Sequence, residues 1–293
     1  MGGRREQTIT LADGRRLGFA EAGDTEGAPL LGFHGTPDSR LLFTAAGYDE
    51  ALRDVGVRFV GVDRPGYGLS DPKPGRGHAD WPADVTALAD ALGLDRFAVL
   101  GYSRGGRYAL ACASLIPDRL TGVGVLSAAG SPDMPGFYRS YPRRVRMELA
   151  FARRAPALWT RLTNSNVRRA AKRPGAVLTP FRLLLTCPAD RAILASDARD
   201  LANSVMEAGR QGPESWRMDE TNQRDPLDFD LDAVTLPVKV WHGTADQLVP
   251  IAQARHLAGR LASAELIELP NVGHLHTPER IAGIARELTQ TSG

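Results

Sequence analysis

The sequence predicts an α/β protein in which a mostly parallel sheet carries helices on both faces. Short apolar runs alternate with amphipathic helical patterns along most of the 293 residues. Each apolar run ends at a polar or glycine-containing turn, as buried parallel strands do. Hydrophobic residues make up 43% of the chain and charged residues 24%, which is typical of a soluble globular protein. The length fits one large α/β domain with an insertion.

The strands and helices follow from these patterns. Residues 7–11 and 15–22 flank Asp13-Gly14, a hairpin signal. Further strands are expected at the apolar runs 29–33, 57–62, 97–102, 120–126, 238–242 and 264–269. Helices are expected at 80–92, 105–116, 251–261 and 278–288. In such a sheet the reactive site forms beyond the carboxyl ends of the strands, where the polar turns of this chain lie.

The alternation stops between residues 131 and 236, where several helices and loops replace the strands. This stretch is too long to be a connection, so we expect a helical cap inserted into a core formed by residues 1–130 and 237–293. Between Arg139 and Arg182 it holds twelve Arg or Lys residues and one acidic residue, Glu148. A solvated helix face explains this charge, and a surface for an anionic substrate, a partner or a membrane is the alternative.

Composition narrows the partners and the compartment. The net charge of +2 gives no reason to expect nucleic acid binding, and no apolar run is long enough to span a membrane. The first residues lack the apolar stretch of a signal peptide, so a cytoplasmic protein is expected. Cys112 and Cys187 show no metal-ligand spacing, and nothing indicates a disulfide between them. A homodimer is compatible with the sequence.

The pentapeptide 101–105, Gly-Tyr-Ser-Arg-Gly, points to chemistry. It follows a predicted strand and precedes a predicted helix, which is the context of a nucleophile elbow. A serine on such a turn has a strained backbone and an exposed hydroxyl, and Gly101 and Gly105 avoid a clash at its flanks. Because the pattern alone also occurs in ordinary turns, Ser103 becomes a candidate nucleophile only if a base, an acid and an oxyanion hole accompany it.

A base and an acid follow later strands. His274 lies in a glycine-containing loop after the last predicted strand, and His276 is its competitor. Asp246 follows the strand at 238–242 and could orient the histidine. The turn after 120–126, Ser-Ala-Ala-Gly, holds no carboxylate, which favours Asp246 as the acid. Since Ser103, Asp246 and His274 each come directly after a strand, they can meet at one edge of the sheet.

An oxyanion hole needs two preorganised donors. The amide of Arg104 at the start of the helix after Ser103 is one candidate, assisted by the helix dipole. The amide of Thr36, in the loop His34-Gly35-Thr36-Pro37, is the second, because proline has no N–H to donate. A plain turn is the alternative explanation of that loop.

The chain carries these motifs in the order that is typical of the α/β-hydrolase superfamily, and it resembles this superfamily over nearly its whole length. The resemblance rests on the loop 34–37, the segment 63–70 (Asp-Arg-Pro-Gly-Tyr-Gly-Leu-Ser), the elbow 101–106, the loop 243–250, and Gly273-His274. It implies an eight-stranded sheet, a cap between the sixth and seventh strands, no cofactor and no metal. It also implies that residues 63–70 brace the site. Within the superfamily the chain resembles esterases. It resembles proline iminopeptidases less well, because these have a glycine at the position of Thr36.

Arg104 departs from the usual pattern of the superfamily, in which the residue after the nucleophile is more often apolar, Gln or His. Its guanidinium could bind a substrate carboxylate, or it could pair with a structural acid such as Asp38 or Asp63. Further candidates for substrate contact are His34, Gly35, Trp159, Phe181 and Trp216. A small core within the cap explains the aromatic residues equally well.

The resulting hypothesis is a serine hydrolase that cleaves a carboxylic ester, thioester or amide of a small molecule through an acyl-enzyme on Ser103. Perhydrolases, carbon–carbon bond hydrolases and lyases of the superfamily use the same triad and stay open as alternatives. A binding protein of the same fold without turnover is a further alternative.

Overall fold

The computed structural model describes residues 6–170, 173–221 and 226–290. The ends of the predicted core segments, 1–5 and 291–293, and the cap residues 171–172 and 222–225 lie outside this description. Eight strands form one sheet in the order β1-β2-β4-β3-β5-β6-β7-β8. β2 pairs antiparallel with both β1 and β4, and the remaining neighbours are parallel. The predicted α/β fold class is confirmed.

The strands lie where the apolar runs predict them, within one or two residues. They are β1 (Gln7–Thr10), β2 (Arg16–Gly23), β3 (Ala28–Phe33), β4 (Val57–Val62), β5 (Phe97–Tyr102), β6 (Leu120–Leu126), β7 (Val238–Gly243) and β8 (Ala264–Leu269). β5, at the centre of the sheet, is buried along its whole length. A continuous apolar run is the pattern that such a doubly covered strand requires.

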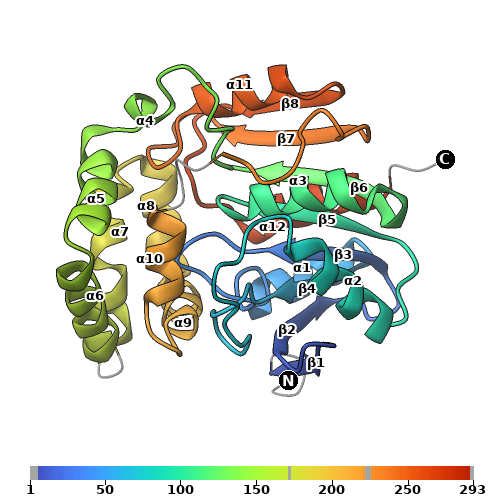
Figure 1. Cartoon of the computed structure of the whole chain (residues 1–293), viewed down its shortest axis with the longest axis horizontal. Coiled ribbons are helices and arrows are strands. Elements are labelled where there is room, and N and C mark those ends of the chain that lie inside the picture. Colours follow the sequence, from blue (N-terminus) through green and yellow to red (C-terminus); the bar gives the residue numbers. More distant parts are fainter. Residues whose placement is uncertain (1–5, 171–172, 222–225, 291–293) are drawn as a thin grey trace.

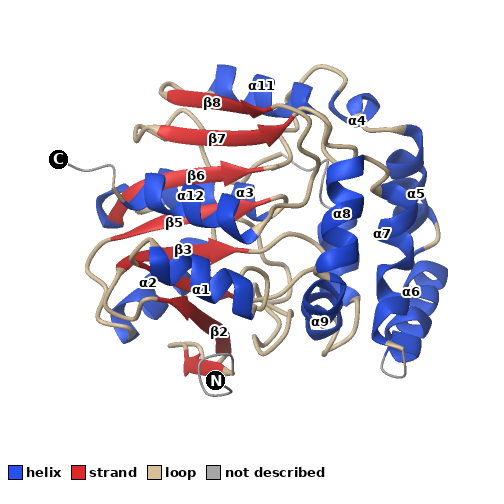
Figure 2. Cartoon of the chain, turned by 180° about the vertical axis from the view of Figure 1, so that it is seen from behind, coloured by secondary structure: helices blue, strands red, loops and turns tan. Residues whose placement is uncertain are grey.

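Helices cover both faces of the sheet (Figures 1 and 2). One face packs against α2 (Trp81–Ala91), α3 (Gly105–Leu115) and α11 (Ile251–Arg260). The other packs against α1 (Ala46–Asp54) and α12 (Pro278–Thr289). Helix α1 is not predicted by the sequence pattern, because only Tyr48 and Leu52 of its short amphipathic stretch are buried.

The helices α4 to α10 all lie between β6 and β7 in the sequence, and they stand beyond the arrowheads of the parallel strands (Figures 1 and 2). We call them the cap: α4 (Phe137–Ser140), α5 (Arg143–Arg154), α6 (Pro156–Ala170), α7 (Thr179–Leu184), α8 (Pro188–Ser196), α9 (Ala198–Ala208) and α10 (Glu214–Thr221). A separate apolar cluster, which includes Trp159, Leu185, Val205 and Trp216, joins helices of the cap, and Phe137 of α4 lies in another cluster with Leu149 of α5. Within the described ranges, no helix is both long and apolar enough to cross a bilayer.

Gly122 in β6 lets the carboxyl end of α12 pack directly on the sheet. A Cβ at Gly122 would lie 2.5 Å from the backbone carbonyl oxygen of Leu288, closer than atoms tolerate. The backbone of α12 would have to move away to make room. By contrast, nothing lies within 4 Å of a Cβ at Gly283, inside α12 itself.

We expect Gly122→Ala to lower the free energy of unfolding by about 1–3 kcal/mol, because it overpacks a rigid backbone contact. Gly283→Ala is the matched control, and it should raise the same quantity by about 0.5–1 kcal/mol through better helix propensity. Urea denaturation measures both. Equal stability of the two variants would contradict the close approach of α12 to β6.

Candidate active site

Ser103 occupies a strained turn between β5 and α3. Its φ is 53°, in the left-handed region, which costs about 1–2 kcal/mol for a residue with a side chain. The flanking glycines make the turn possible. A Cβ at Gly101 would lie 2.4 Å from the carbonyl oxygen of Gly105, and a Cβ at Gly105 would lie 2.0 Å from that of Phe33. The turn therefore places Ser103 at the carboxyl end of the sheet, where it lines a cavity.

His274 and Asp246 form a buried pair in the loops that follow β8 and β7. His274 Nδ1 lies 2.7 Å from Asp246 Oδ2. The other carboxylate oxygen accepts the amides of Leu248 at 2.8 Å and Val249 at 2.9 Å. With Nδ1 bound to a carboxylate, Nε2 is the nitrogen of His274 left to exchange a proton. His274 lines the same cavity as Ser103.

The pKa of His274 is raised above its ordinary value of 6.5. Burial lowers it, but the charge of Asp246 and the hydrogen bond to that carboxylate outweigh burial. Asp190 and Asp38 add to the same effect. Burial in turn raises the pKa of Asp38 to about 7. The environment therefore favours a proton on His274, which suits a group that must accept one during the reaction.

His276, the competing histidine, faces another way. Its Nε2 lies 2.9 Å from the hydroxyl of Ser127, and its backbone carbonyl accepts the hydroxyl of Tyr48. Burial, followed by the charge of His274, holds the pKa of His276 well below its usual range. The side chain is nearly inaccessible and does not line the cavity. Of the two histidines, His274 is the one that lines the same cavity as Ser103.

The loop after β3 contributes Thr36 to the cavity, but not His34. A Cβ at Gly35 would approach Ser103 Cβ to 3.0 Å, so the loop touches the nucleophile turn through its backbone. His34 is buried behind it, where Nδ1 donates to the carbonyl of Gly35 and Nε2 accepts the amide of Arg64. His34 and Gly35 are not among the residues that line the cavity, and the expected substrate contact through them stays a prediction. His34 stabilises the loop, and Gly35 provides space.

Asp219 of the cap binds this loop from above. Its Oδ2 accepts hydrogen bonds from the hydroxyls of Thr36 at 2.6 Å and Tyr67 at 2.5 Å, and from Arg64 Nη1 at 2.6 Å. Its Oδ1 accepts a bond from Arg76 at 3.1 Å. The surrounding charges hold the pKa of Asp219 well below its ordinary value despite burial. Nothing in the sequence around Asp219 predicts this contact.

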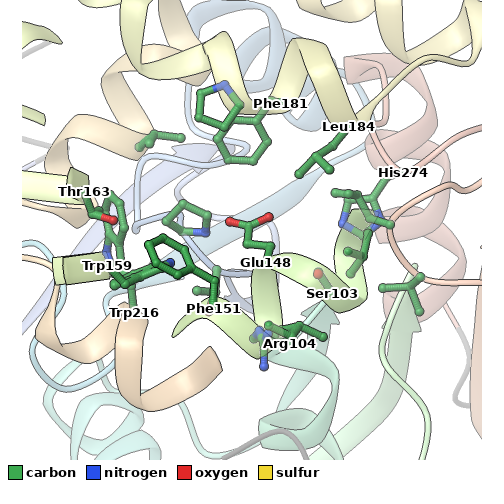
Figure 3. A pocket seen from close by; sticks show the side chains of 18 of the residues that line it. Ser103, Arg104, Glu148, Phe151, Trp159, Thr163, Phe181, Leu184, Trp216 and His274 are labelled. Carbon is green, nitrogen blue, oxygen red and sulfur yellow. The ribbon is translucent and has the colours of Figure 1, made fainter. Parts of the chain in front are cut away.

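Arg104 also binds this part of the cap. Its Nη1 donates to the backbone carbonyl of Asp219 at 2.6 Å, and Arg104 lines the cavity beside Ser103 (Figure 3). Asp63 and Asp38, the two acids expected as possible partners of the Arg104 guanidinium, have different neighbours. Asp63 binds Arg40 at 2.9 Å, and Asp38 lies near His274 and Arg64.

A second cap carboxylate supports the histidine loop. Asp190 in α8 accepts the amides of His274 at 3.1 Å and Leu275 at 2.8 Å. Gly273 makes room for it, since a Cβ there would lie 2.2 Å from Asp190 Oδ2. Asp190 was not predicted from the sequence, in which Gly273 before the histidine is the one residue type that indicates this contact. Cys187 is unpaired, as is Cys112, and its sulfur caps α8 by accepting the amide of Asp190.

The cavity that Ser103 and His274 line, which we call the catalytic cavity, has a volume of about 340 Å³ and is lined mostly by apolar side chains of the cap. Figure 3 shows Ser103 and His274 at one end and Trp159 and Trp216 at the other. Phe181 lines it as well, so the three predicted aromatic residues all face the cavity. Trp159 and Trp216 also belong to the apolar cluster of the cap, so a place in the core of the cap and a place in the wall of the cavity are compatible. Among the described residues, no cluster of three or more His, Cys, Asp or Glu could hold a metal ion.

Asp219→Ala should lower the free energy of unfolding by about 3–5 kcal/mol, because it leaves the fully buried Arg64 without its carboxylate. Glu207→Gln is the matched control. Glu207 also joins the cap to a core arginine, Arg40, but that arginine keeps Asp63. Urea denaturation should show a clearly smaller loss for Glu207→Gln, and equal losses would contradict the special position of Asp219.

Comparisons with known proteins agree with this architecture. The chain is 31% identical over 219 residues to RutD of Caulobacter sp. (strain K31), a protein described as a carbamate hydrolase, covering 73% of this chain and 70% of that protein. It is 26% identical over 283 residues to a non-heme chloroperoxidase of Streptomyces lividans, covering 91% and 92% of the two chains.

Among solved structures, a thermophilic esterase from Thermogutta terrifontis superposes with a TM-score of 0.67 at 24% identity, covering 96% of this chain and 97% of that one. This likeness concerns the fold. The family model described as alpha/beta hydrolase fold matches residues 28–279, which is most of the sequence. The chain therefore belongs to the alpha/beta hydrolase fold family.

Proposed function

We propose that this protein is a serine hydrolase that cleaves a carboxylic ester of a small molecule through an acyl-enzyme on Ser103. One observation carries the proposal. Ser103, held at positive φ at the start of α3, faces the same cavity as His274, whose Nδ1 is bound to Asp246. Acyl transfer needs a nucleophile, a base that takes its proton, and a carboxylate that orients the base.

In the proposed mechanism, Ser103 Oγ attacks the ester carbonyl carbon while His274 Nε2 takes its proton. Asp246 stabilises the imidazolium that forms. The amides of Thr36 and Arg104 stabilise the negative charge on the carbonyl oxygen, and the N-terminus of α3 adds a favourable dipole. His274 then protonates the leaving alcohol. Water, activated by the same histidine, releases the acid and restores Ser103.

The lining of the catalytic cavity supports an ester with an apolar portion. Phe151, Trp159, Phe181, Leu184 and Trp216 surround the space beyond Ser103. Burying an apolar group there contributes about 25 cal/mol for each Å² removed from water. An acyl chain or alcohol of several carbons would therefore bind better than an acetyl or methyl group.

A perhydrolase is the second candidate, because the relative from Streptomyces lividans is a non-heme chloroperoxidase and matches nearly the whole chain. The acyl-enzyme would be the same. The acceptor distinguishes the two activities, since water yields a carboxylic acid and hydrogen peroxide yields a peracid.

Ser103→Ala should reduce ester turnover by about 10⁴-fold or more, because the acyl-enzyme can no longer form. The same change should abolish labelling of the folded protein by a fluorophosphonate probe. Ser114→Ala, which removes a hydroxyl bound to the backbone carbonyl of Asp230, is the control and should keep both. Full activity of Ser103→Ala would overturn the proposal.

The pH dependence follows from the raised pKa of His274. The histidine acts as a base only when neutral, so kcat/KM should rise with pH through a midpoint above 6.5 and fall as pH drops through it. Asp246→Asn removes the charge that raises this pKa. It should move the midpoint down and lower turnover by about 10³- to 10⁴-fold. Asp133→Asn, which alters an exposed pair with Arg260, should leave the midpoint unchanged. An unmoved midpoint in Asp246→Asn would contradict the assignment.

A further inference from the structure

The helices α5, α6 and α7 form the outer layer of the cap. In both views they lie farther from the sheet than α8 and α9 do (Figures 1 and 2). On their inner side they line the catalytic cavity, with Leu149, Trp159 and Phe181 among the lining residues. Their other side meets solvent and carries exposed arginines of the basic stretch 139–182. The chemistry of this solvent-facing side is therefore separate from that of the cavity wall.

Large apolar side chains are exposed on the outer layer. Among the described residues, five large hydrophobic residues are exposed, and four of them lie here: Met147, Leu158, Leu162 and Leu183. Between 50% and 70% of each of the four is accessible to solvent. One exposed apolar side chain is ordinary, whereas several on one layer indicate a surface that another molecule covers. Leu162 also lines the catalytic cavity, so it lies at the rim of that cavity.

On α5, helical spacing places arginines beside the exposed methionine. Arg143 precedes Met147 by four residues and Arg154 follows it by seven, so the three side chains share one face of the helix. The residues Val145 and Leu149, which line the cavity, lie on the opposite face. The stripe of Arg143, Met147 and Arg154 therefore points away from the cavity.

The next two helices repeat this arrangement. On α6, Leu158, Leu162 and Arg169 have the same spacing of four and seven residues, and the exposed Arg161 lies beside them. On α7, exposed Arg182 directly precedes exposed Leu183. We call the combined surface the outer cap face. It consists of Arg143, Met147, Arg154, Leu158, Arg161, Leu162, Arg169, Arg182 and Leu183.

The positive charge of the outer cap face is not neutralised by the protein. In the part of the chain that the structure describes, none of its five arginines pairs with a carboxylate. Exposed arginines of the core differ, since Arg53 binds Asp49 and Arg255 binds Glu268. Five unpaired guanidinium groups on one layer create a positive potential that attracts an anionic partner.

We propose that the outer cap face binds the surface of a bilayer that contains anionic phospholipids. Arginines attract the lipid phosphates, while leucine and methionine side chains bury themselves at the boundary between head groups and acyl chains. A nucleic acid would satisfy the arginines but would leave the aliphatic side chains in water. In this orientation the rim of the catalytic cavity at Leu162 lies next to the bilayer. The proposal does not depend on ester hydrolysis.

Vesicle co-sedimentation tests the proposal with the full chain. We expect binding to phosphatidylcholine vesicles that contain about 30% phosphatidylglycerol, weaker binding as salt is added, and no binding to phosphatidylcholine alone. The triple variant Arg154→Gln, Arg161→Gln and Arg169→Gln should weaken binding on the order of 100-fold, since each arginine contributes about fivefold. Lysine at the same three positions should restore binding, because it keeps the charge.

A triple variant of the core is the matched control for net charge. It combines Arg53→Gln, Arg255→Gln and Arg286→Gln, which change exposed arginines of α1, α11 and α12. This protein loses the same charge as the cap variant and should bind vesicles like the wild type. Equal losses in the two glutamine variants would overturn the proposal, because net charge alone would then explain the binding.

The apolar contribution is tested separately. Leu183→Ser should weaken vesicle binding about fivefold, whereas Leu115→Ser, at an exposed leucine of α3 in the core, should not change it. Vesicle binding that is the same in these two variants would overturn the insertion of the outer cap face into lipid. Absence of binding to anionic vesicles by the wild type would overturn the proposal, and so would tighter binding to duplex DNA that Leu183→Ser leaves unchanged.

Discussion

The backbone at the end of β5 and the start of α3 lies so close to β3 and to the turn after β6 that no side chain fits between them. A Cβ at Gly105 would overlap the carbonyl of Phe33, and one at Gly106 would lie 2.4 Å from Ala128 Cβ. This contact forces Ser103 into the left-handed conformation and brings the first turn of α3 against the loop after β3. The hydroxyl, the helix N-terminus and Thr36 are thereby placed together by backbone packing, and the histidine loop and the cap are arranged around them.

The cap completes the site mainly through carboxylates. Asp190, Glu207 and Asp219 lie on α8, α9 and α10, and they bind the histidine loop, Arg40 and Arg64 of the core. Burying such charges is unfavourable unless their hydrogen bonds are complete, and Asp219 meets this condition with four side-chain donors. The apolar side chains of the cap fill its interior, contact Tyr67 of the core and line the catalytic cavity.

Local patterns were sufficient to predict the sheet, the strand–turn–helix motif at Ser103, and the positions of Asp246 and His274 after their strands. They failed where a contact joins residues distant in sequence. Asp190 and Asp219 lie on helices with no motif around them, and their partners are 84 and 155 residues away. For the same reason, local patterns did not predict that the ring of His34 accepts the amide of Arg64, 30 residues away. Gly273 is the one residue whose type indicates such a contact, because a side chain there would overlap Asp190.

The polar docking of the cap limits how freely its sequence can be exchanged. A cap taken from another protein of this fold would bring its own charges to the positions of Asp190, Glu207 and Asp219. Arg64, which is completely buried, would then lie against a surface without a carboxylate placed to neutralise its charge. A chimera designed to transfer substrate preference would therefore have to exchange the cap together with the core arginines that it binds.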